Sequence, residues 1–448
     1  MKYAASVGVV VLTALGACAA WAEEAEGPRS SDWVAALPDG ETKRKMIVGC
    51  TSCHPMGLPV AFRMDEKGWG EAVRKMKKID DDLDLALIPF QAGELEAWLS
   101  KNAKMPSKGA LVATAKAEFR EYPAGKGTGF YHDMALAGGK AWIADYFGNI
   151  LYGVDPATGA VEEHPIPVTV APGKPGGAHA IDVTRDGQLW ITFTKSEQVA
   201  HFDTKTGTFK MYGPYPKGGN VQYFVLDADR FIYEDKQGGI WTTHFSKVML
   251  SRLDPRTGEI KSYPAAPSTT LPEKAVHLYA AVADSKGKFW YTETHGNRLG
   301  TLDPETGKSE VFEIFAPWSG PKRLAIDPDD RLWIPQLASG EIALFDTKAR
   351  KVERTLQVPI PGDYVYAVRR NRFTGDLWAT GCGSDSLYRL DPKTFAFTIF
   401  RLPRRGAYTR TVAFDPDGTV WTCYSAFPNK HTITGGETGT VLRVTPKE

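Results

Sequence analysis

A tryptophan recurs at nearly even spacing through most of this 448-residue chain. Each copy lies in a short run typical of a β-strand, and successive copies are 48, 51, 49, 43, 45 and 43 residues apart: Trp142, Trp190, Trp241, Trp290, Trp333, Trp378 and Trp421. Turns rich in Asp and Gly flank many of these runs, as at 184–187 and 254–258. Four strands in each repeat of about 45 residues are typical of a β-propeller, so the pattern predicts seven blades.

The two ends of the repeat region predict how the ring of blades closes. The last repeat ends with a strand at 439–444, which leaves no room for a fourth strand. The segment 117–123 resembles fourth strands elsewhere, such as 261–264. We therefore expect a propeller domain over 117–448, with 117–123 completing the last blade and removing the open sheet edges.

The first 22 residues have the pattern of a secretory signal peptide. Lys2 precedes an apolar run over 3–17, and 20–22 offers a cleavage site of small residues. The run is shorter than the roughly 20 residues that a bilayer requires, so no membrane span is expected. We expect an exported, periplasmic protein, with lipidation at Cys18 as a less favoured alternative.

The composition excludes some functions. Lys and Arg number 54 against 53 Asp and Glu, which argues against nucleic acid as the main partner because such a partner needs a basic surface. With 42% hydrophobic and 24% charged residues, the chain has the proportions of an ordinary globular protein.

A Cys-x-x-Cys-His motif spans Cys50 to His54 and predicts a covalently bound haem c. Cys50 and Cys53 would form thioethers to the two vinyl groups of one porphyrin, and His54 would bind the iron. A redox dithiol followed by an unrelated histidine is the alternative. The remaining propeller cysteines, Cys382 and Cys423, could form a disulfide or remain two buried thiols.

Residues 28–105 resemble the monohaem cytochrome c domains, with helical stretches before the motif, at 68–76 and at 91–101. The resemblance implies a small all-α domain, joined to the propeller by a linker over 106–116, and a methionine as the second axial ligand. We favour Met76, from its spacing after the preceding tryptophan, although a Met on an amphipathic helix is more often a core residue. The candidates for this ligand are Met56, Met64, Met76 and Met105.

The repeat region, over about 117–446, resembles the streptogramin (virginiamycin B) lyase family of seven-bladed propellers. The matching elements are 179–181 with 189–192, and 289–293 with 296–300. The fold class implied by both resemblances is therefore multidomain: an all-α cytochrome c domain followed by an all-β propeller.

The lyase resemblance implies histidines at the start of two successive first strands, glutamates that complete a magnesium site, and one histidine as base. His179 fits one of these positions, and His132 lies one residue out of register. Asp145 and Glu293 occupy the position of the carboxylates, but blade two has Phe193 there. The set is incomplete, so the resemblance does not by itself carry the lyase reaction to this chain.

The direction of the strands places the candidate catalytic residues at one mouth of the central channel. First strands begin at this mouth and second strands end there, and these positions hold His132, His179, His277, His244, His295 and His431, with Asp145, Glu293 and Tyr279 at the same level. Imidazoles and carboxylates together could transfer protons or bind a second, divalent metal, the candidate ligands being His132, His179, His277, His244 and Glu293. A polar mouth lined by hydrated histidines is the alternative.

Blades five to seven bring basic and aromatic residues to the same mouth, which suits an anionic or phenolic small molecule. These residues are Lys322, Arg323, Arg404, Arg405 and Arg410, with Tyr364, Tyr366, Tyr408 and Tyr424. Ordinary loop charge is the alternative interpretation.

We expect from these features a periplasmic oxidoreductase of the dehydrogenase type. Haem c would pass electrons from or to a small molecule at the channel mouth, and a periplasmic electron-transfer partner would follow. The presence of a haem motif favours redox chemistry, because an elimination needs no haem. The alternatives are a streptogramin-lyase-like C–O lyase with an accessory haem, and a non-catalytic electron carrier whose propeller docks a protein.

Overall fold

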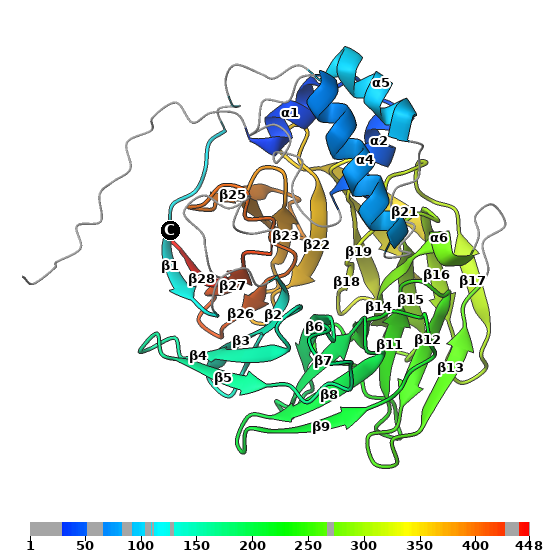
Figure 1. The fold of residues 1–448 in the computed structure, drawn as a ribbon, viewed down its shortest axis with the longest axis vertical. Helices are drawn as coiled ribbons and strands as arrows, with labels where there is room; N and C mark the ends of the chain where they lie inside the picture. Colours follow the sequence, from blue (N-terminus) through cyan, green and yellow to red (C-terminus); the bar gives the residue numbers. More distant parts are fainter. Residues whose placement is uncertain are drawn as a thin grey trace, which may run out of the picture.

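The computed structural model describes residues 29–51, 66–82, 92–103, 109, 112–125, 130–266, 273–425 and 439–447. In this part of the chain a β-propeller follows a small helical region (Figure 1). No helix within these ranges combines the length and the apolar character needed to cross a membrane.

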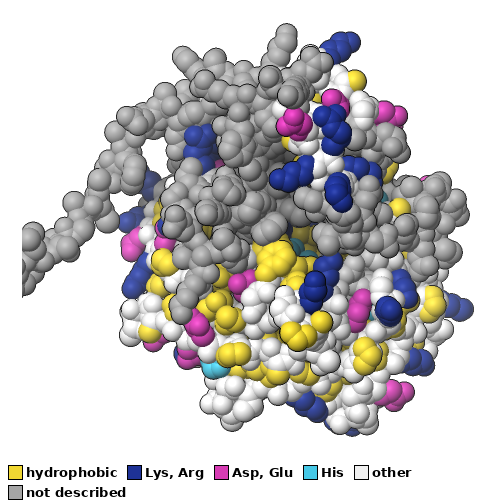
Figure 2. Space-filling model, in the orientation of Figure 1, with side chains coloured by type: hydrophobic (Ala, Val, Ile, Leu, Met, Phe, Trp, Pro, Cys, Tyr) yellow, Lys and Arg dark blue, Asp and Glu magenta, His cyan; other side chains and the backbone are white. Residues whose placement is uncertain are grey.

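The helical region contains four described helices: α1 (Ser30–Ala36), α2 (Glu41–Cys50), α4 (Glu66–Asp82) and α5 (Ala92–Asn102). Helices α4 and α5 pack against each other, with an ion pair of 2.7 Å between Arg74 and Glu96. The outer surface of this region carries many Lys and Arg side chains (Figure 2), and those exposed on α4 include Arg74, Lys75 and Lys78.

Helices α1 and α2 are docked on the propeller through a shared apolar core. Trp33 and Val48 belong to the same buried cluster as Leu337 and Tyr408 of the propeller. Gly320 permits this close approach, because a Cβ at its left-handed backbone (φ +66°) would lie 2.7 Å from Val48. The helical region therefore has a defined place over blades five to seven (Figure 1).

Twenty-eight described strands form seven four-stranded antiparallel blades. Blade one contains β2 (Tyr131–Ala137), β3 (Lys140–Asp145), β4 (Ile150–Val154) and β5 (Val161–Pro165). Blade two contains β6 (Ala178–Val183), β7 (Leu189–Phe193), β8 (Gln198–Asp203) and β9 (Thr208–Tyr212). Blade three contains β10 (Val221–Leu226), β11 (Ile240–His244), β12 (Met249–Leu253) and β13 (Ile260–Pro264). Blade four contains β14 (Leu278–Ala283), β15 (Phe289–Glu293), β16 (Arg298–Leu302) and β17 (Ser309–Phe312), and the helix α6 (Glu273–Val276) precedes it. Blade five contains β18 (Ala325–Ile326), β19 (Arg331–Gln336), β20 (Glu341–Asp346) and β21 (Lys351–Gln357). Blade six contains β22 (Val365–Arg370), β23 (Leu377–Gly381), β24 (Ser386–Leu390) and β25 (Phe397–Arg401). Blade seven contains β26 (Ala413–Phe414), β27 (Val420–Cys423), β28 (Thr440–Pro446) and β1 (Ala117–Pro123).

The last blade takes strands from both ends of the propeller. β1 pairs antiparallel with β28, from Ala117 opposite Pro446 to Pro123 opposite Thr440. This pairing joins the start of the propeller to its end, so the outer edge of β28 is covered.

In four of the seven blades the repeated tryptophan is bonded to the turn that precedes it. The indole nitrogen of Trp241 donates to Asp235 at 2.9 Å, and the same bond recurs from Trp290 to Asp284, from Trp333 to Asp327 and from Trp421 to Asp415. A buried indole N–H is stabilised by such a partner, which explains why Asp and Trp stand six residues apart in these four blades. Trp142 donates instead to the carbonyl of Ala137 at 2.9 Å. These residues are structural.

Candidate active site

Side chains from the first strand of each blade, or from the segment that leads into it, meet at one mouth of the central channel. We call this set the mouth ring; it comprises His132, His179, Tyr223, Tyr279, Lys322, Arg323, Tyr366, Tyr408 and Arg410. All nine side chains are buried.

A local irregularity in the strand turns several of these side chains toward the channel. The pairing of first and second strands shifts register between Tyr131 and Met134 and between Ala178 and Ile181. Equivalent shifts flank Tyr223, Tyr279 and Tyr366. Bulges of this kind re-aim side chains, and they place five members of the ring.

A threonine of the second strand satisfies the backbone that the bulge leaves unpaired. Thr192 accepts a hydrogen bond from the backbone N–H of Ala180 at 3.0 Å, and Thr380 accepts one from Ala367 at 3.2 Å. Each threonine stands two residues after the tryptophan of its blade. The Trp-x-Thr pattern of the sequence therefore supports the shape of the mouth.

Five members of the ring form a closed circuit of contacts. The imidazoles of His132 and His179 stack with their centroids 3.6 Å apart, and His179 contacts Tyr223 at 4.9 Å between centroids. The hydroxyl of Tyr223 donates to that of Tyr279 at 3.3 Å, and Tyr279 is hydrogen-bonded to Tyr366. Tyr366 returns to His132 through a 3.3 Å contact between Oη and Nε2.

Three cations lie against this circuit. Lys322 Nζ is 4.1 Å from the ring centroid of Tyr279, and the guanidinium of Arg323 is 4.4 Å from that of Tyr223. Arg410 lies 5.6 Å from the ring centroid of Tyr366, and 4.5 Å from that of Tyr408 outside the circuit. Cations over aromatic faces are attracted to the ring electrons, and burial strengthens this attraction.

The two stacked imidazoles are neutral at neutral pH. Burial, followed by the charge of His179 and the neighbouring cations, holds the pKa of His132 well below 6.5. Burial and the cations, Arg323 first, act in the same direction on the pKa of His179. Within the described residues Nδ1 of each imidazole is buried and has no hydrogen-bond partner, so each ring keeps one nitrogen that can accept or donate a proton.

The phenols of the ring are proton donors under the same conditions. Burial raises the pKa of Tyr223, Tyr279 and Tyr408 well above 10. Protonated phenols beside neutral imidazoles provide an acid and a base within one contact circuit.

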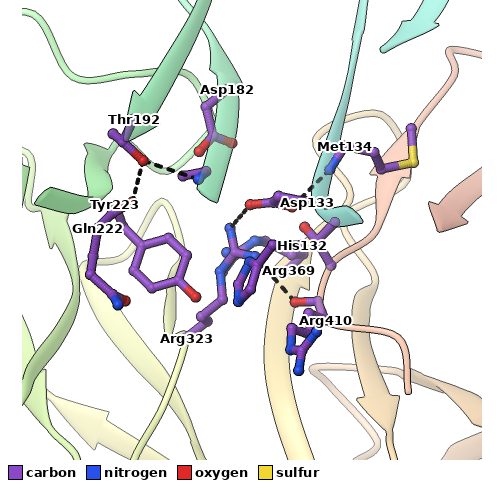
Figure 3. Close-up of polar contacts among 12 residues, drawn as sticks. His132, Asp133, Met134, Asp182, Thr192, Gln222, Tyr223, Arg323, Arg369 and Arg410 are labelled. Atoms are coloured by element: carbon purple, nitrogen blue, oxygen red, sulfur yellow. Dashed lines mark hydrogen bonds and ion pairs between the residues drawn. The ribbon is translucent and has the colours of Figure 1, made fainter. Parts of the chain in front are cut away.

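A second layer of charge lies deeper in the channel (Figure 3). Arg323 Nη2 and Asp133 Oδ2 form an ion pair of 2.7 Å in which both side chains are fully buried. Asp182 faces this pair, and Arg230 approaches Asp182 to 3.8 Å. Burial, then the charge of Asp133, raises the pKa of Asp182 to about 6. Arg369 completes the layer and donates to the carbonyl of Leu324 at 3.2 Å.

The helical region reaches the mouth ring at Tyr408. The hydroxyl of Tyr408 donates to the carbonyl of Thr51, the residue after Cys50 at the end of α2. A buried ion pair of 2.7 Å between Arg29 and Asp385 fixes the start of α1. The first half of the Cys-x-x-Cys-His motif therefore lies beside the ring.

Two of the histidines predicted from the sequence form a pair one layer outside the ring. Nδ1 of His277 and Nδ1 of His295 are 3.0 Å apart. Phe245 stacks on His277 with centroids 4.1 Å apart and also contacts Tyr279 at 5.9 Å. Phe245 thus separates the pair from the contact circuit.

Three other predicted residues make local bonds instead of entering the ring. His244 Nε2 contacts Ser251 Oγ at 2.7 Å between two strands of blade three. Glu293 accepts a 2.7 Å bond from Arg298, and Asp145 accepts the backbone N–H of Phe147 at 2.9 Å. In the described part of the chain no group of three or more His, Cys, Asp or Glu side chains is arranged to hold a metal ion.

The remaining candidates are dispersed or lie outside the described residues. Arg404 and Tyr424 both bond Glu121, and Tyr364 packs beside Tyr408 with ring centroids 6.3 Å apart. Cys382 and Cys423 are buried thiols and not a disulfide. Cys53, His54, Met56, Met64, Met105 and His431 lie outside the described residues.

Sequence reasoning missed several residues of the channel. Tyr223 occupies the same first-strand position as His179, so alignment of the repeats could have found it. Three further channel residues follow ring positions by one or three residues: Asp133, Asp182 and Arg369. They face the channel because of the bulges, and no sequence pattern predicted the bulges.

Comparison with known proteins agrees with the propeller. Residues 268–434 match the Virginiamycin B lyase family. Lactonase drp35 of Staphylococcus aureus is 23% identical over 239 residues, covering 50% of this chain and 67% of the lactonase. The homologue from Staphylococcus epidermidis is 24% identical over the same length.

Solved structures of similar fold include virginiamycin B lyase from Staphylococcus aureus. It superposes with a TM-score of 0.60 at 20% identity, over 74% of this chain and all of the lyase. A catalytically inactive variant of that lyase, solved with quinupristin, matches with the same TM-score at 19% identity. At such identity the likeness establishes the shared propeller fold: the chain carries a virginiamycin B lyase-like and lactonase-like β-propeller behind a short helical region.

Proposed function

We propose that the mouth ring is the active site of an enzyme that acts on a small organic molecule by general-base catalysis, as a lyase or a hydrolase. One observation carries the proposal: two stacked, neutral imidazoles, His132 and His179, contact the phenols of Tyr366 and Tyr223 beside buried cations at the channel mouth. The similarity to a lyase and to lactonases favours this chemistry over the redox reaction expected from the sequence.

The ring supplies the groups that an elimination needs. A free imidazole nitrogen of His132 or His179 takes a proton from carbon as a carbon–carbon double bond forms. The neighbouring carbon–oxygen bond breaks, and the leaving oxygen receives a proton from a phenol such as Tyr366. Lys322 stabilises the negative charge that develops on oxygen before this proton arrives.

The same groups also support hydrolysis of a lactone. An imidazole then takes a proton from water, and the resulting hydroxide adds to the carbonyl carbon. The two reactions differ in the product, because elimination preserves the mass of a cyclic ester and hydrolysis adds one water.

The test uses quinupristin and a panel of lactones with the mature protein, analysed by mass spectrometry. We expect ring opening that the single variants H132N and H179N reduce by about 10²-fold or more, the range typical of a lost acid–base group. His201 is half-buried on β8, the third strand of blade two, and serves as the matched control, so H201N should retain activity. Equal activity in all three variants would refute the assignment.

Contact between the haem motif and the ring supports a second candidate function. The phenol of Tyr408, a member of the ring, bonds the carbonyl of Thr51 within the motif that predicts haem c. Cys50 on α2 is buried, and Met76 lies on α4 of the same helical region, so both would be available to hold a haem there. When bound, the haem would supply one-electron chemistry at the edge of the ring.

In this second candidate the exported protein exchanges electrons between a ring-bound molecule and a periplasmic partner. The test begins with expression alongside the haem-attachment machinery. A Soret band that survives acid–acetone extraction would establish covalent haem, and Cys50→Ala should weaken it. If the panel of small molecules opens at the ring without changing the haem spectrum, the first candidate stands and the haem is accessory.

A further inference from the structure

Buried positive charge exceeds buried negative charge along the channel. In the deeper layer three guanidiniums face two carboxylates: Arg230, Arg323 and Arg369 against Asp133 and Asp182. Burial raises the pKa of Asp182 to about 6, which weakens its negative charge further near neutral pH. A buried charge is costly unless a partner compensates it, so this layer favours an added anion.

The mouth ring above this layer adds two further buried cations. Lys322 and Arg410 are 2% and 0% exposed, and they join Arg323 around the imidazoles. The charges that lower the pKa of both His132 and His179 include these three cations. The field at the two imidazoles is therefore that of buried cations.

Two guanidiniums of the deeper layer have unused donors. Nε of Arg323 and Nε of Arg369 are buried and have no hydrogen-bond partner within the described residues. Both side chains are at least 97% buried, with exposures of 0% and 3%. Guanidinium groups bind carboxylate and phosphate oxygens through such donors.

We propose that the channel binds a small oxyanion of the carboxylate or phosphate class, with dianions favoured over monoanions, among Lys322, Arg323 and Arg410. This inference rests on the proposed function, because it names the charge of the molecule that the ring binds. An anion there cancels the field of the cations and raises the basicity of the adjacent imidazole. The charged ligand thus activates the base, which otherwise is weak because its pKa is low.

The binding test compares sodium succinate and inorganic phosphate with acetate and neutral succinamide at constant ionic strength. Calorimetry and thermal unfolding of the mature full chain should show saturable binding of a dianion at least tenfold tighter than acetate. Succinamide should produce no shift of the melting temperature. Phosphate binding without succinate binding would identify the phosphate class, and the reverse would identify the dicarboxylate class.

Variants separate the site from a general salt effect. Lys322→Met should weaken the dianion at least tenfold, whereas Lys205→Met, which changes an exposed lysine in a turn of blade two, should not. Arg410→Lys keeps the charge and should retain most of the binding. If Lys322→Met disturbs folding, Arg410→Met gives an independent measure of dianion binding. Circular dichroism then checks the fold of this variant, and calorimetry measures its affinity for the dianion.

A proton-linked readout distinguishes this inference from the proposed catalysis. Calorimetry in buffers of different ionisation enthalpy should show proton uptake when the dianion binds, and the double variant H132N/H179N should bind the dianion with less uptake. Dianion binding without any turnover would refute the proposed function and leave this inference standing. The inference would be overturned if acetate and succinate shifted the melting temperature equally, and if succinate shifted Lys322→Met as much as the unchanged protein. Tight binding of succinamide would also overturn it.

Discussion

The buried ion pair between Arg323 and Asp133 allows a quantitative test of how the channel is stabilised. Both side chains are fully buried and their charged atoms are 2.7 Å apart. Replacing Asp133 with Asn keeps the size of the side chain but leaves the guanidinium without its closest counter-charge. Breaking a buried pair in this way typically costs about 3–5 kcal/mol. Asp133→Asn should therefore lower the free energy of unfolding by about 3 kcal/mol, near the lower bound, because Asn can still accept a hydrogen bond.

Urea denaturation at neutral pH measures this change, and an exposed pair provides the control. Lys236 and Glu305 are 3.0 Å apart with side chains 81% and 74% exposed, so Glu305→Gln should leave the unfolding midpoint unchanged. Replacing both charges by apolar residues, as in Asp133→Leu with Arg323→Met, should recover part of the loss. Equal midpoints for Asp133→Asn and Glu305→Gln would refute the reasoning.

Acid should destabilise the chain through the mouth ring: the folded pKa values of His132 and His179 lie well below 6.5, so the unfolded chain binds more protons and stability falls as the pH drops below about 6.5. The loss of melting temperature between about pH 7 and pH 5 should be smaller in H132N/H179N. Gly362→Ala should loosen α1, because a Cβ at its left-handed backbone would overlap Ser31 and Ala35; hydrogen exchange should increase in α1 but not in the blades, and unchanged exchange would contradict the docking. Deleting 117–123 should expose the edge of β28 and cause association measurable by light scattering, whereas a monodisperse product would show that the edge is protected without β1.

The repeat was predictable because the same residues perform the same structural task in four of the seven blades. An indole that must bond an aspartate, as in Trp290 with Asp284, fixes a spacing that survives in the sequence. The channel mouth was predictable as a location for the same reason, since the strand direction follows from the order of the turns. His132, His179 and Tyr279 reach the mouth together for this reason.

The identity of the site was less predictable, because residues at the same level of the propeller can point in different directions. His244 and Glu293 end second strands at the mouth, but their side chains bond Ser251 and Arg298 within their own blades. Tyr223 enters the ring because its strand bulges after Val221. A one-residue change of register reverses the direction of a side chain, so strand position alone could not separate these two groups.

The low basicity of the ring histidines and the positive charge of the channel are two consequences of one arrangement. Burial, and then the cations beside His132 and His179, reduce the affinity of these imidazoles for protons, which makes them poor bases. The same cations attract an anion, and a bound anion cancels the part of the pKa depression that the cations cause. A neutral molecule lacks this effect, so a propeller with this ring should discriminate among substrates by charge in the rate of proton transfer as well as in affinity. The test is the first-order rate at saturating substrate, compared between anionic and neutral substrates. In this ring the rate should depend on substrate charge, whereas in a ring that selects its ligand by shape alone it should not.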